Sequence, residues 1–590
     1  MSPGALARYG GIATELICLS FGITLSRLPW GLRPKNPVNY NSWTFWILFA
    51  LVIVRYWRLS HRHQNDLLLV ASYFFYGFWD YRFLFLILIS TIIDYIGGLG
   101  VAGIRLTTDR IRRLGVLTVG SAILLCANVR YPVLFQGFVE LDWQRILEAL
   151  PHTLRDFYIP FAVTAVCLTY GRALPWLYEL PEAARRKYFL VISMVANLGI
   201  LGFFKYFDFF IDNFRTLVMS MGFGAPSWTT LGILLPAGVS FYTFQAMSYT
   251  IDIYRGHTKP TQHFRDFALF VCFFPHLVAG PIMRAHTFLP QVVNPRRLAP
   301  GAFEQGLYLV VIGLFKKIVI ADNMAVIANH LFNRFQHGEA AALTGLDVLI
   351  GVYAFAFQIY CDFSGYSSIA RGISKWLGFE LIINFNTPYL AVSPSDFWRR
   401  WHISLSTWLR DYLYVSLGGN RFGPLMTYRN LLITMLLGGL WHGANWTFFA
   451  WGFYHGAILC AYRLLNISDD IATESAAGRA YWLWRVFLMF HLTCIGWLLF
   501  RADSFASVWQ MATLIATNPA VTLFAVSSFA TIVFYCTLMF VLEWWLEGER
   551  RLDRLLTPNW LLRAPVYSYL VLMLVIFRAG EAHEFIYFQF

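Results

Sequence analysis

The sequence has few charged residues for its length. Asp, Glu, Lys and Arg make up 13% of its 590 residues, whereas ordinary soluble domains contain about a quarter. Hydrophobic residues make up 58%, and the mean hydropathy is +0.54. No segment is both long and polar enough to be a soluble domain, since the most hydrophilic internal segment, 466–479, has the length of a loop. These absences exclude a soluble multidomain protein and indicate an integral membrane protein.

Closely spaced cysteines and internal repeats are also missing. The eight cysteines stand singly and include no CxxC pair, which argues against a zinc site or a disulfide framework. We therefore expect no metal site, and we read the cysteines as small core residues. The lack of a visible repeat weakens the interpretation as an inverted-repeat transporter.

Acidic residues are outnumbered by basic ones. The chain has 33 Asp and Glu against 46 Lys and Arg, which gives a formal net charge of +13. In a soluble protein this excess would suggest nucleic-acid binding. Here the basic residues gather in short loops between apolar runs, at 55–63, 105–113 and 172–187, while the loop at 130–155 is nearly neutral. Basic loops tend to stay on the cytoplasmic side, so this alternation indicates the orientation of the chain in the membrane. We expect the three basic loops to be cytoplasmic and expect no nucleic-acid binding.

The apolar runs predict an all-α polytopic membrane protein, because about 20 apolar residues are needed to cross the hydrocarbon core. The expected spans are 41–56, 66–79, 81–104, 114–128, 156–171, 188–211, 229–250, 304–325, 344–362, 429–462, 481–500, 522–545 and 564–579. Shorter runs interrupted by glycine and proline are predicted to be re-entrant or interfacial, at 266–283, 363–377 and 393–416.

Residues 1–37 look like an extension ahead of a membrane domain at 38–590. Gly11–Leu28 is apolar, but it contains Glu15 and has neither a basic start nor a small-residue cleavage site. It is therefore not interpreted as a removable signal peptide. A first span, an interfacial helix and an overlong start remain open.

The stretch from Ser393 to His455 is the most informative part of the chain. Ser393, Pro394 and Asp396 have the pattern of an N-cap, a first-turn proline and an acidic N3 residue. The following residues place their aromatic side chains on one helical arc and their arginines on the other, with His402 at the boundary. This pattern predicts one amphipathic helix at a membrane interface or inside a polar funnel, with Trp401, Leu405 and Trp408 facing inward. The other side chains of the pattern are Phe397, Trp398, Leu409 and Tyr412 on the apolar arc, and Arg399, Arg400, Ser404, Ser406, Arg410 and Asp411 on the polar one.

Several ionisable residues interrupt the apolar runs, and such residues are candidates for function. For most of them a structural role, such as snorkelling or helix capping, is the better interpretation. For His442, flanked by Trp441, Gly443 and Trp446, we favour function, because small residues beside it would let a substrate approach closely and nothing nearby in sequence neutralises it. The ionisable residues considered are Asp94, Lys205, Asp208, Asp252, His276, Lys316, Lys317, Asp322, Asp362, His402, His442, His455 and His491.

Several motifs resemble those of the membrane-bound O-acyltransferases (MBOATs), in particular the bacterial alginate O-acetyltransferase branch. Together they cover most of residues 40–590. A single WHG would be weak evidence, whereas this many motifs in this order is specific. The matching pieces are 70–77 (VASYFFYG), 201–207 (LGFFKYF), 235–245 (LPAGVSFYTFQ), 275–282 (PHLVAGPI), 362–366 (DFSGY), 393–420, 439–443 (GLWHG) and the closing 585–590 (FIYFQF).

This resemblance implies a ring of tilted helices around a central funnel. It also implies that His442 is the catalytic histidine and that His402 is the second histidine that often accompanies it. Two features depart from the family pattern: the extension at 1–37 and a longer segment at about 98–185, which is predicted to insert a helix pair at 114–128 and 156–171.

Transfer of an acyl group from a thioester to a hydroxyl needs a base at the hydroxyl and stabilisation of the oxyanion. Histidine suits the first role because its pKa lies near neutrality, and we assign that role to His442. Asn445, Trp441 and Asp252 are candidate supporting residues. Arg399 and Arg400 could hold the donor phosphates, although contact with lipid headgroups explains them equally well.

The resemblance implies acetyl-CoA as the donor substrate, no bound cofactor, a polysaccharide acceptor and a multi-pass location in the bacterial inner membrane. Because the chain contains no G-D-S nucleophile motif, a periplasmic SGNH-hydrolase-like acetyltransferase is expected as a partner. Alternatives are a relative that uses D-alanyl or lipid acyl transfer, and a transporter whose polar residues line a path without covalent turnover.

Overall fold

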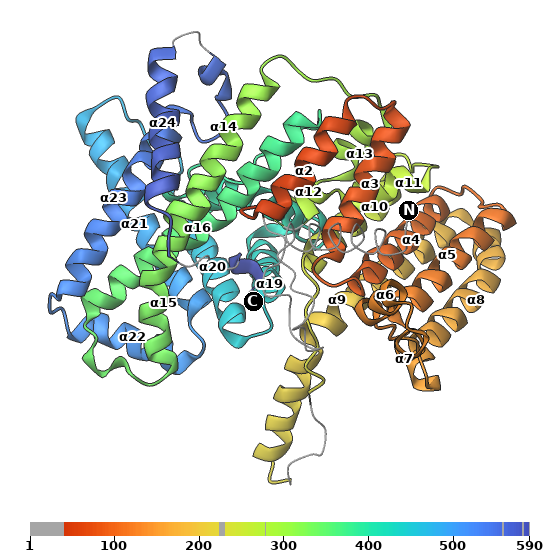
Figure 1. The fold of residues 1–590 in the computed structure, drawn as a ribbon. Helices are drawn as coiled ribbons and strands as arrows, with labels where there is room; N and C mark the ends of the chain where they lie inside the picture. Colours follow the sequence, from red (N-terminus) through yellow and green to blue (C-terminus); the bar gives the residue numbers. More distant parts are fainter. Residues whose placement is uncertain are drawn as a thin grey trace. The chain divides into compact units, whose positions relative to one another are not determined.

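The computed structural model describes residues 40–223, 230–277, 279–556, 560–580, 583 and 585–588 (Figure 1). The predicted extension at 1–37 lies outside these residues. Within them every regular element is a helix, which confirms the all-α prediction. The helices are α2 (Trp43–Tyr56), α3 (His61–Gly77), α4 (Phe83–Val101), α5 (Thr108–Cys126), α6 (Tyr131–Glu140), α7 (Trp143–Glu148), α8 (Tyr158–Glu179), α9 (Glu182–Ser220), α10 (Val239–Tyr254), α11 (Phe264–Cys272), α12 (Phe274–Leu277), α13 (Ala285–Val293), α14 (Ala302–Leu314), α15 (Asp322–Gln336), α16 (Gly345–Trp376), α17 (Pro394–Arg400), α18 (Ile403–Trp408), α19 (Gly423–His442), α20 (Trp446–Leu464), α21 (Ala476–Arg501), α22 (Phe505–Thr517), α23 (Leu523–Trp545) and α24 (Trp560–Ile576).

Shorter helical turns connect or extend these helices. Two π-helical segments, η2 (Phe315–Ala321) and η5 (Leu409–Tyr414), continue α14 and α18. The 3₁₀ turns are η1 (Leu154–Phe157), η3 (Ala340–Ala342), η4 (Pro388–Leu390), η6 (Leu552–Leu556) and η7 (Ile586–Phe588).

Six helices of the described chain have the length and apolar composition to cross a bilayer, and the bent pair of α5 and α6 would add a seventh. The chain is therefore a multi-pass membrane protein. These six are α4, α8 with η1, α9, α16, α21 and α23.

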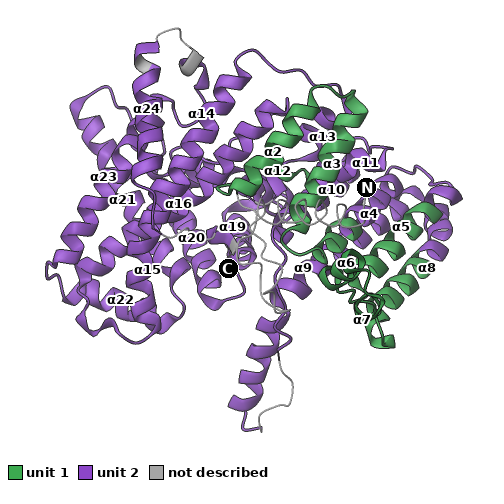
Figure 2. Ribbon diagram, in the orientation of Figure 1, with its two compact units in different colours: residues 1–89, 112–170, 272–274 green, residues 90–111, 171–271, 275–590 purple. Residues whose placement is uncertain are grey.

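The chain forms two compact units, coloured separately in Figure 2. Unit 1 contains residues 1–89, 112–170 and 272–274, and unit 2 contains residues 90–111, 171–271 and 275–590. The predicted helix pair at 114–128 and 156–171 corresponds to α5 and α8, with the short helices α6 and α7 between them. All the side chains of the candidate site described below belong to unit 2.

Most predicted spans match a helix, but three spans and two of the shorter pieces differ from the prediction. Residues 344–377, expected as a span and a broken piece, form the single helix α16, and the expected span at 229–250 becomes a helix only at Val239. The amphipathic segment 393–416 divides at His402, and the expected span 429–462 divides at residues 443–445. In the last two cases the side-chain pattern continues across a backbone break. Hydrophobicity reflects burial and not the direction of the chain, so the pattern does not show the break.

The two halves of 429–462 form an antiparallel hairpin, because small residues let α19 and α20 approach closely. A Cβ on Gly439 would clash with the carbonyl oxygen of Phe448 and would lie 3.0 Å from the Cα of Gly452. A Cβ on Gly452 would in turn clash with the carbonyl oxygen of Met435. Close backbone approach through glycine is a common way to pack helices in membranes. It places the turn 443–445 at the tip of the hairpin.

Glycine also governs the packing of α16 against α14. A Cβ on Gly365 would lie 2.8 Å from the carbonyl oxygen of Gly313, and a Cβ on Gly372 would lie 2.7 Å from that of Gly306. The spacing of seven residues on each helix repeats this contact two turns apart. The resulting contact holds α16 in the interior, where most of its side chains are buried.

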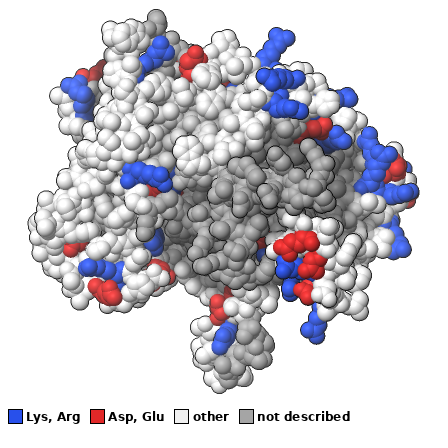
Figure 3. Space-filling view, in the orientation of Figure 1, with Lys and Arg blue, Asp and Glu red and all other residues white. Residues whose placement is uncertain are grey.

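Charge is sparse on the molecular surface. On the face shown in Figure 3, Lys, Arg, Asp and Glu occur in a few separate groups on a largely uncharged surface. This distribution is typical of a protein whose surface mostly contacts lipid.

Candidate active site

His442 is the last residue of α19 and lies at the tip of the α19–α20 hairpin. It is therefore at a helix terminus and not inside a continuous apolar helix, as its sequence context had suggested. Its side chain is 4% exposed, and its ring centroid lies 5.0 Å from Trp441, 5.1 Å from Trp451 and 5.6 Å from Tyr587. Among the described residues its Nδ1 has no hydrogen-bond partner. A buried and unpaired ring nitrogen costs stability, and His442 therefore stays a candidate for function.

A lysine and a tyrosine from α9 cap the helix that carries His442. Lys205 Nζ donates hydrogen bonds to the carbonyl oxygens of Trp441, at 2.6 Å, and His442, at 2.9 Å. The Tyr206 hydroxyl donates to the carbonyl oxygen of Leu440 at 2.7 Å. Helix C-termini leave their last carbonyls unsatisfied and favour a cation. Lys205 Nζ therefore fixes the end of α19 beside His442.

A cavity of about 340 Å³ adjoins the hairpin tip. Its polar lining comes from Lys205, Asp208 and Asn445, and the remaining lining residues are Phe204, Ile233, Leu235, Gly443, Ala444 and Phe448. Asp208 forms part of this wall by accepting the backbone N–H groups of Leu231, at 2.9 Å, and Ile233, at 3.0 Å. The cavity is therefore an apolar chamber with a few polar groups, next to the histidine.

His402 lies at the break between α17 and α18 in a left-handed backbone conformation, with φ 41° and ψ 55°. It is fully buried. Its Nδ1 lies 3.2 Å from Asn384 Oδ1, which also accepts the backbone N–H of Ser404 at 3.2 Å. Because that atom accepts a backbone donor, it is the amide oxygen, and His402 Nδ1 must be the donor. The neutral ring then has its lone pair on Nε2, which has no partner among the described residues.

The two histidines belong to one aromatic cluster. The Trp441 ring lies 5.0 Å from His442 and 6.1 Å from His402. A second connection runs through Tyr587, 5.6 Å from His442, and Phe363, which is 4.6 Å from Tyr587 and 4.7 Å from His402. The histidines thus share neighbours, although forty residues separate them in sequence.

Asn445 has a structural contact that the sequence had not specified. It is the N-cap of α20, and its side-chain oxygen accepts the backbone N–H of Thr447 at 3.1 Å. Its Nδ2 donates to the carbonyl oxygen of Asp503 at 3.4 Å. Asn445 therefore lines the cavity and shapes the hairpin tip, without a hydrogen bond to His442.

The two arginines predicted to bind donor phosphates are paired with protein groups. Arg399 contacts Asp469, and Arg400 Nε donates to Asp396 at 2.9 Å. Arg400 also donates to the Thr387 hydroxyl at 3.2 Å. These contacts hold α17 in place, and the predicted cap by Ser393 is confirmed, with its hydroxyl accepting the Asp396 N–H at 3.0 Å.

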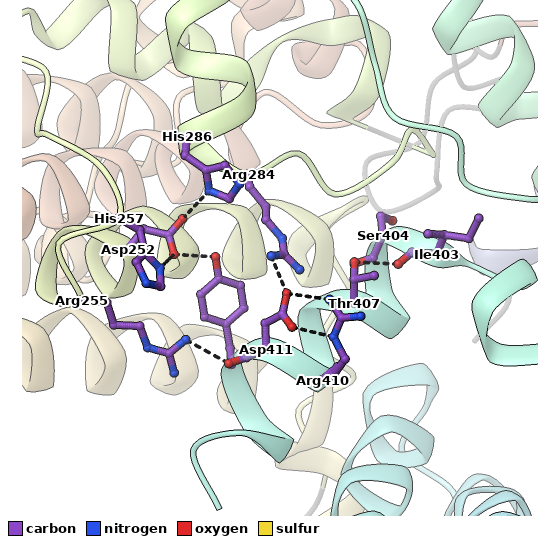
Figure 4. Close-up of polar contacts among 11 residues, drawn as sticks. Asp252, Arg255, His257, Arg284, His286, Ile403, Ser404, Thr407, Arg410 and Asp411 are labelled. Atoms are coloured by element: carbon purple, nitrogen blue, oxygen red, sulfur yellow. Dashed lines mark hydrogen bonds and ion pairs between the residues drawn. The ribbon is translucent and has the colours of Figure 1, made fainter. Parts of the chain in front are cut away.

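Asp252 lies in a different polar cluster, at the end of α10 (Figure 4). It accepts the Tyr412 hydroxyl at 2.8 Å, and its other oxygen lies 3.1 Å from His286 Nδ1. A third ring, that of His257, lies 3.8 Å away. Asp252 is bonded within this cluster and not to His442 or His402, contrary to its predicted supporting role there.

The same cluster contains a second carboxylate, Asp411, which is surrounded by arginines. Arg284 pairs with it at 2.6 Å, and Arg410 pairs with it at 2.6 Å. Burial alone would raise the pKa of Asp411, but hydrogen bonds from Arg410 and Arg284 outweigh burial and hold that pKa below its ordinary value. The pKa of Asp411 is lower in the folded protein than in the unfolded chain. Its ion pairs therefore stabilise the fold fully at a pH above the unfolded-state pKa, and this stabilisation is lost as the pH falls through the folded-state pKa.

Comparison with known proteins identifies the family. Residues 261–500 match the model of the membrane-bound O-acyltransferase family. The chain is 37% identical over 475 residues to a probable alginate O-acetylase of Azotobacter vinelandii, covering 80% of this chain and 77% of that protein. It is 38% identical to the corresponding Pseudomonas aeruginosa protein, covering 80% and 74%. A peptidoglycan O-acetyltransferase of Helicobacter pylori is 33% identical, covering 73% and 88%.

The chain belongs to the membrane-bound O-acyltransferase family. It is therefore an O-acyltransferase. The family match includes His402 and His442, whereas Lys205 and Asp208 lie outside the matched residues. In this MBOAT the wall of the cavity beside His442 is thus partly supplied by α9.

Sequence reasoning missed two residues of this MBOAT site. Lys205 was interpreted as a snorkelling side chain, yet it caps α19. Asn384 was not singled out, yet it fixes the tautomer of His402. An intramembrane lysine inside the FFKY motif was a detectable signal for the first, whereas nothing near Asn384 in sequence indicated the second.

Proposed function

We propose that this MBOAT moves an acetyl group from cytoplasmic acetyl-CoA across the membrane toward hydroxyls of an extracytoplasmic polysaccharide, with His442 as general base. The observation that carries this proposal is the buried, unpaired ring of His442 at a hairpin tip beside a cavity. The acetyl group and the polysaccharide class follow from the relatives named alginate O-acetylase and peptidoglycan O-acetyltransferase.

Helix lengths support extracytoplasmic access for the acceptor. The basic start of α9, at Arg185–Lys187, belongs on the cytoplasmic side. Lys205 follows 18 residues later, about 27 Å along the helix, which is close to the thickness of the hydrocarbon core. Independently, α19 begins after Arg421 and runs 20 residues to His442. Both helices favour a cavity that opens toward the extracytoplasmic side.

The reaction balances with one proton transfer. His442 removes the proton from the acceptor hydroxyl as its oxygen attacks the thioester carbonyl. The tetrahedral intermediate then expels the thiolate, so that the C–O bond forms and the C–S bond breaks. The proton held by His442 goes to the leaving sulfur, directly or through Nε2 of His402. Histidine is suited to both transfers because it both accepts and donates protons near neutral pH.

Trp441 is the best candidate to stabilise the oxyanion. Its indole N–H is buried without a partner among the described residues, and its ring contacts both histidines. An unpaired buried donor costs about 1–3 kcal/mol. This cost is offset if the indole N–H bonds the negative charge that develops in the transition state.

Placement in the bacterial inner membrane follows from the cytoplasmic donor and the external acceptor. A separate periplasmic transferase, of the SGNH-hydrolase type, would then supply the acceptor hydroxyl and pass the acetyl group from its own ester to the polysaccharide.

The direct test uses purified protein in proteoliposomes with labelled acetyl-CoA on one side and glycan fragments, with or without a partner transferase, on the other. We expect acetyl turnover that needs His442. Turnover of His442→Ala should fall by about 10²–10⁴-fold, the usual contribution of a general base, with normal membrane abundance. His337→Ala, at an exposed end of α15, is the control. A His442→Ala protein with near-normal turnover would contradict the assignment.

Trp441→Phe tests the oxyanion role separately, because it removes the N–H and keeps most of the ring. We expect kcat to fall by about 10²-fold with little change in KM. Trp484→Phe, on an exposed face of α21, is the matched control. An unchanged kcat in Trp441→Phe would remove this residue from the mechanism.

A further inference from the structure

We infer that Arg255, Arg284 and Arg410 form a binding site for the phosphate groups of the acyl donor, a coenzyme A thioester. This inference rests on the proposed function for the identity of the donor. The three arginines come from the end of α10, the residue before α13, and η5 (Figure 4). They take the place of Arg399 and Arg400, which are engaged with acidic side chains.

The cluster has more positive charge than its own acids neutralise. Its three guanidinium groups face two carboxylates, Asp411 and Asp252, and the second of these is already bonded to Tyr412 and His286. Arg255 donates to the carbonyl oxygen of Asp411 at 2.9 Å and not to its carboxylate. At least one positive charge therefore remains for an anionic ligand.

The arginines are fixed in place and still have donors to offer. Arg255 and Arg284 each lie over the ring of Tyr412, at 5.4 Å and 5.3 Å from its centroid. Arg284 is 19% exposed, and one of its nitrogens, Nη2, is buried without a partner among the described residues. Arg410 is 62% exposed. Planar guanidinium groups held in this way match the geometry of phosphate oxygens.

A row of rings connects this cluster to His442. Tyr412 lies 5.0 Å from Trp408, Trp408 stacks on Phe244 at 3.9 Å, and Phe244 lies 5.5 Å from Trp441. Trp441 contacts His442 at 5.0 Å. A donor with its phosphates at the arginines would therefore lay its extended arm along an aromatic wall that ends at the catalytic histidine.

The spacing of His402 and Arg410 along the chain agrees with a donor that runs from the arginines toward the histidines. Arg410 follows His402 by eight residues in α18 and η5, about 12 Å along the axis. The segment after α10 contains Arg255, Lys259 and Arg265, which by the distribution of basic residues belongs on the cytoplasmic side. The arginine site is thus on the side from which a soluble donor arrives.

Phosphate chemistry is shared by a soluble donor and a lipid headgroup, so the test must separate the two. Protein in nanodiscs of neutral phosphatidylcholine is titrated calorimetrically with coenzyme A, with dephospho-coenzyme A, and with pantetheine, which has no phosphate. We expect Arg410→Gln and Arg284→Gln to raise the Kd for coenzyme A about tenfold or more, the effect of one charge-assisted hydrogen bond. Pantetheine binding should be weak and equal in all variants.

Arg421→Gln provides the control, since Arg421 is an exposed arginine of the turn before α19. It should bind coenzyme A like the parent protein. Arg284→Lys should recover part of the affinity by restoring the charge without the planar fork. Should Arg284→Gln be unstable, the exposed Arg410→Gln variant still decides the question.

Unchanged coenzyme A affinity in both glutamine variants would overturn the proposal. So would a loss confined to anionic lipid, measured by adding phosphatidylglycerol to the nanodiscs, with coenzyme A binding unaffected. The binding assay is independent of turnover: His442→Ala should bind coenzyme A normally. A protein that binds coenzyme A through these arginines but transfers no acetyl group would uphold the site and refute the proposed function.

Discussion

At the scale of single residues, the contacts of Lys205 determine how His442 is presented. Its ammonium bonds the last two carbonyls of α19 and lies 5.8 Å from the centroid of the Trp441 ring. A lysine in an apolar helix is costly unless its charge is compensated, and the helix C-terminus provides that compensation. We interpret Lys205 as a positioning residue that acts through His442.

Lys205→Met should lower kcat about tenfold and leave the KM for acetyl-CoA unchanged, because it loosens the helix end without touching the donor site. Lys205→Arg should recover much of the loss by restoring the cation. Steady-state kinetics in proteoliposomes checks both. A purely structural role would instead reduce the amount of folded protein while leaving the kcat of the folded fraction intact.

The backbone of His402 gives a second prediction at this scale. A left-handed conformation costs a residue with a side chain about 1–2 kcal/mol, and glycine does not pay this cost. His402→Gly relieves this strain but leaves a cavity where the imidazole packs against Phe363 and Trp441, so its thermal stability should fall. Its turnover should fall as well.

Asn466→Gly is the matched control, because Asn466 has a similar φ of 51° in a loop. It should leave turnover unchanged. A His402→Gly protein with parental kinetics would show that His442 acts without this partner.

At the scale of elements, the hairpin of α19 and α20 holds the site together. Its two helices approach through Gly439 and Gly452, whereas the adjacent Gly438 points elsewhere, with its nearest neighbour the flexible Leu409 side chain at 3.1 Å. A single methyl group should therefore have very different effects at two consecutive positions.

We expect Gly439→Ala to destabilise the protein by about 1–3 kcal/mol, the usual cost of overpacking, and to lower activity by moving His442. Gly438→Ala should be much milder. Thermal unfolding in detergent, followed by tryptophan fluorescence, measures the difference. Equal effects at the two positions would contradict the close approach of the helices.

At the scale of the whole molecule, a buried ionic network ties the C-terminal segment to the interior of unit 2. Lys317 bonds Asp322 at 2.8 Å, Asp362 at 2.9 Å and the carbonyl oxygen of His583 at 2.9 Å. Asp362 also accepts the backbone N–H of Ile586 at 2.7 Å. The network holds the chain end beside α16, where the Tyr587 ring meets His442.

Lys317→Met should destabilise the protein by about 3–5 kcal/mol, because it leaves two buried carboxylates without their cation. Adding Asp322→Asn and Asp362→Asn should restore part of the stability by removing those charges. Lys187→Met, at the exposed start of α9, is the control. A tolerated Lys317→Met would show that the carboxyl groups are already neutral.

Membrane topology can be tested at the same scale. The basic loops predict a cytoplasmic start for α9 and an extracytoplasmic position for α7. A cysteine at Glu148 should react with an impermeant maleimide in spheroplasts, whereas a cysteine at Lys187 should react only after permeabilisation. The opposite pattern would invert the proposed direction of transfer.

The sequence by itself predicted the all-α membrane class, most helix positions and the Ser393 cap, and it nominated the two histidines as candidates, because hydrophobic runs, caps and local motifs are properties of neighbouring residues. Tertiary structure alone decided the break at His402, the hairpin that brings His442 to a helix end, and the partners Lys205 and Asn384. It also paired Arg399 and Arg400 with acidic side chains and brought together arginines from three separate elements around Asp411. These features depend on contacts between residues far apart in the chain, and no local pattern records which distant side chain will satisfy a helix end or neutralise a buried charge.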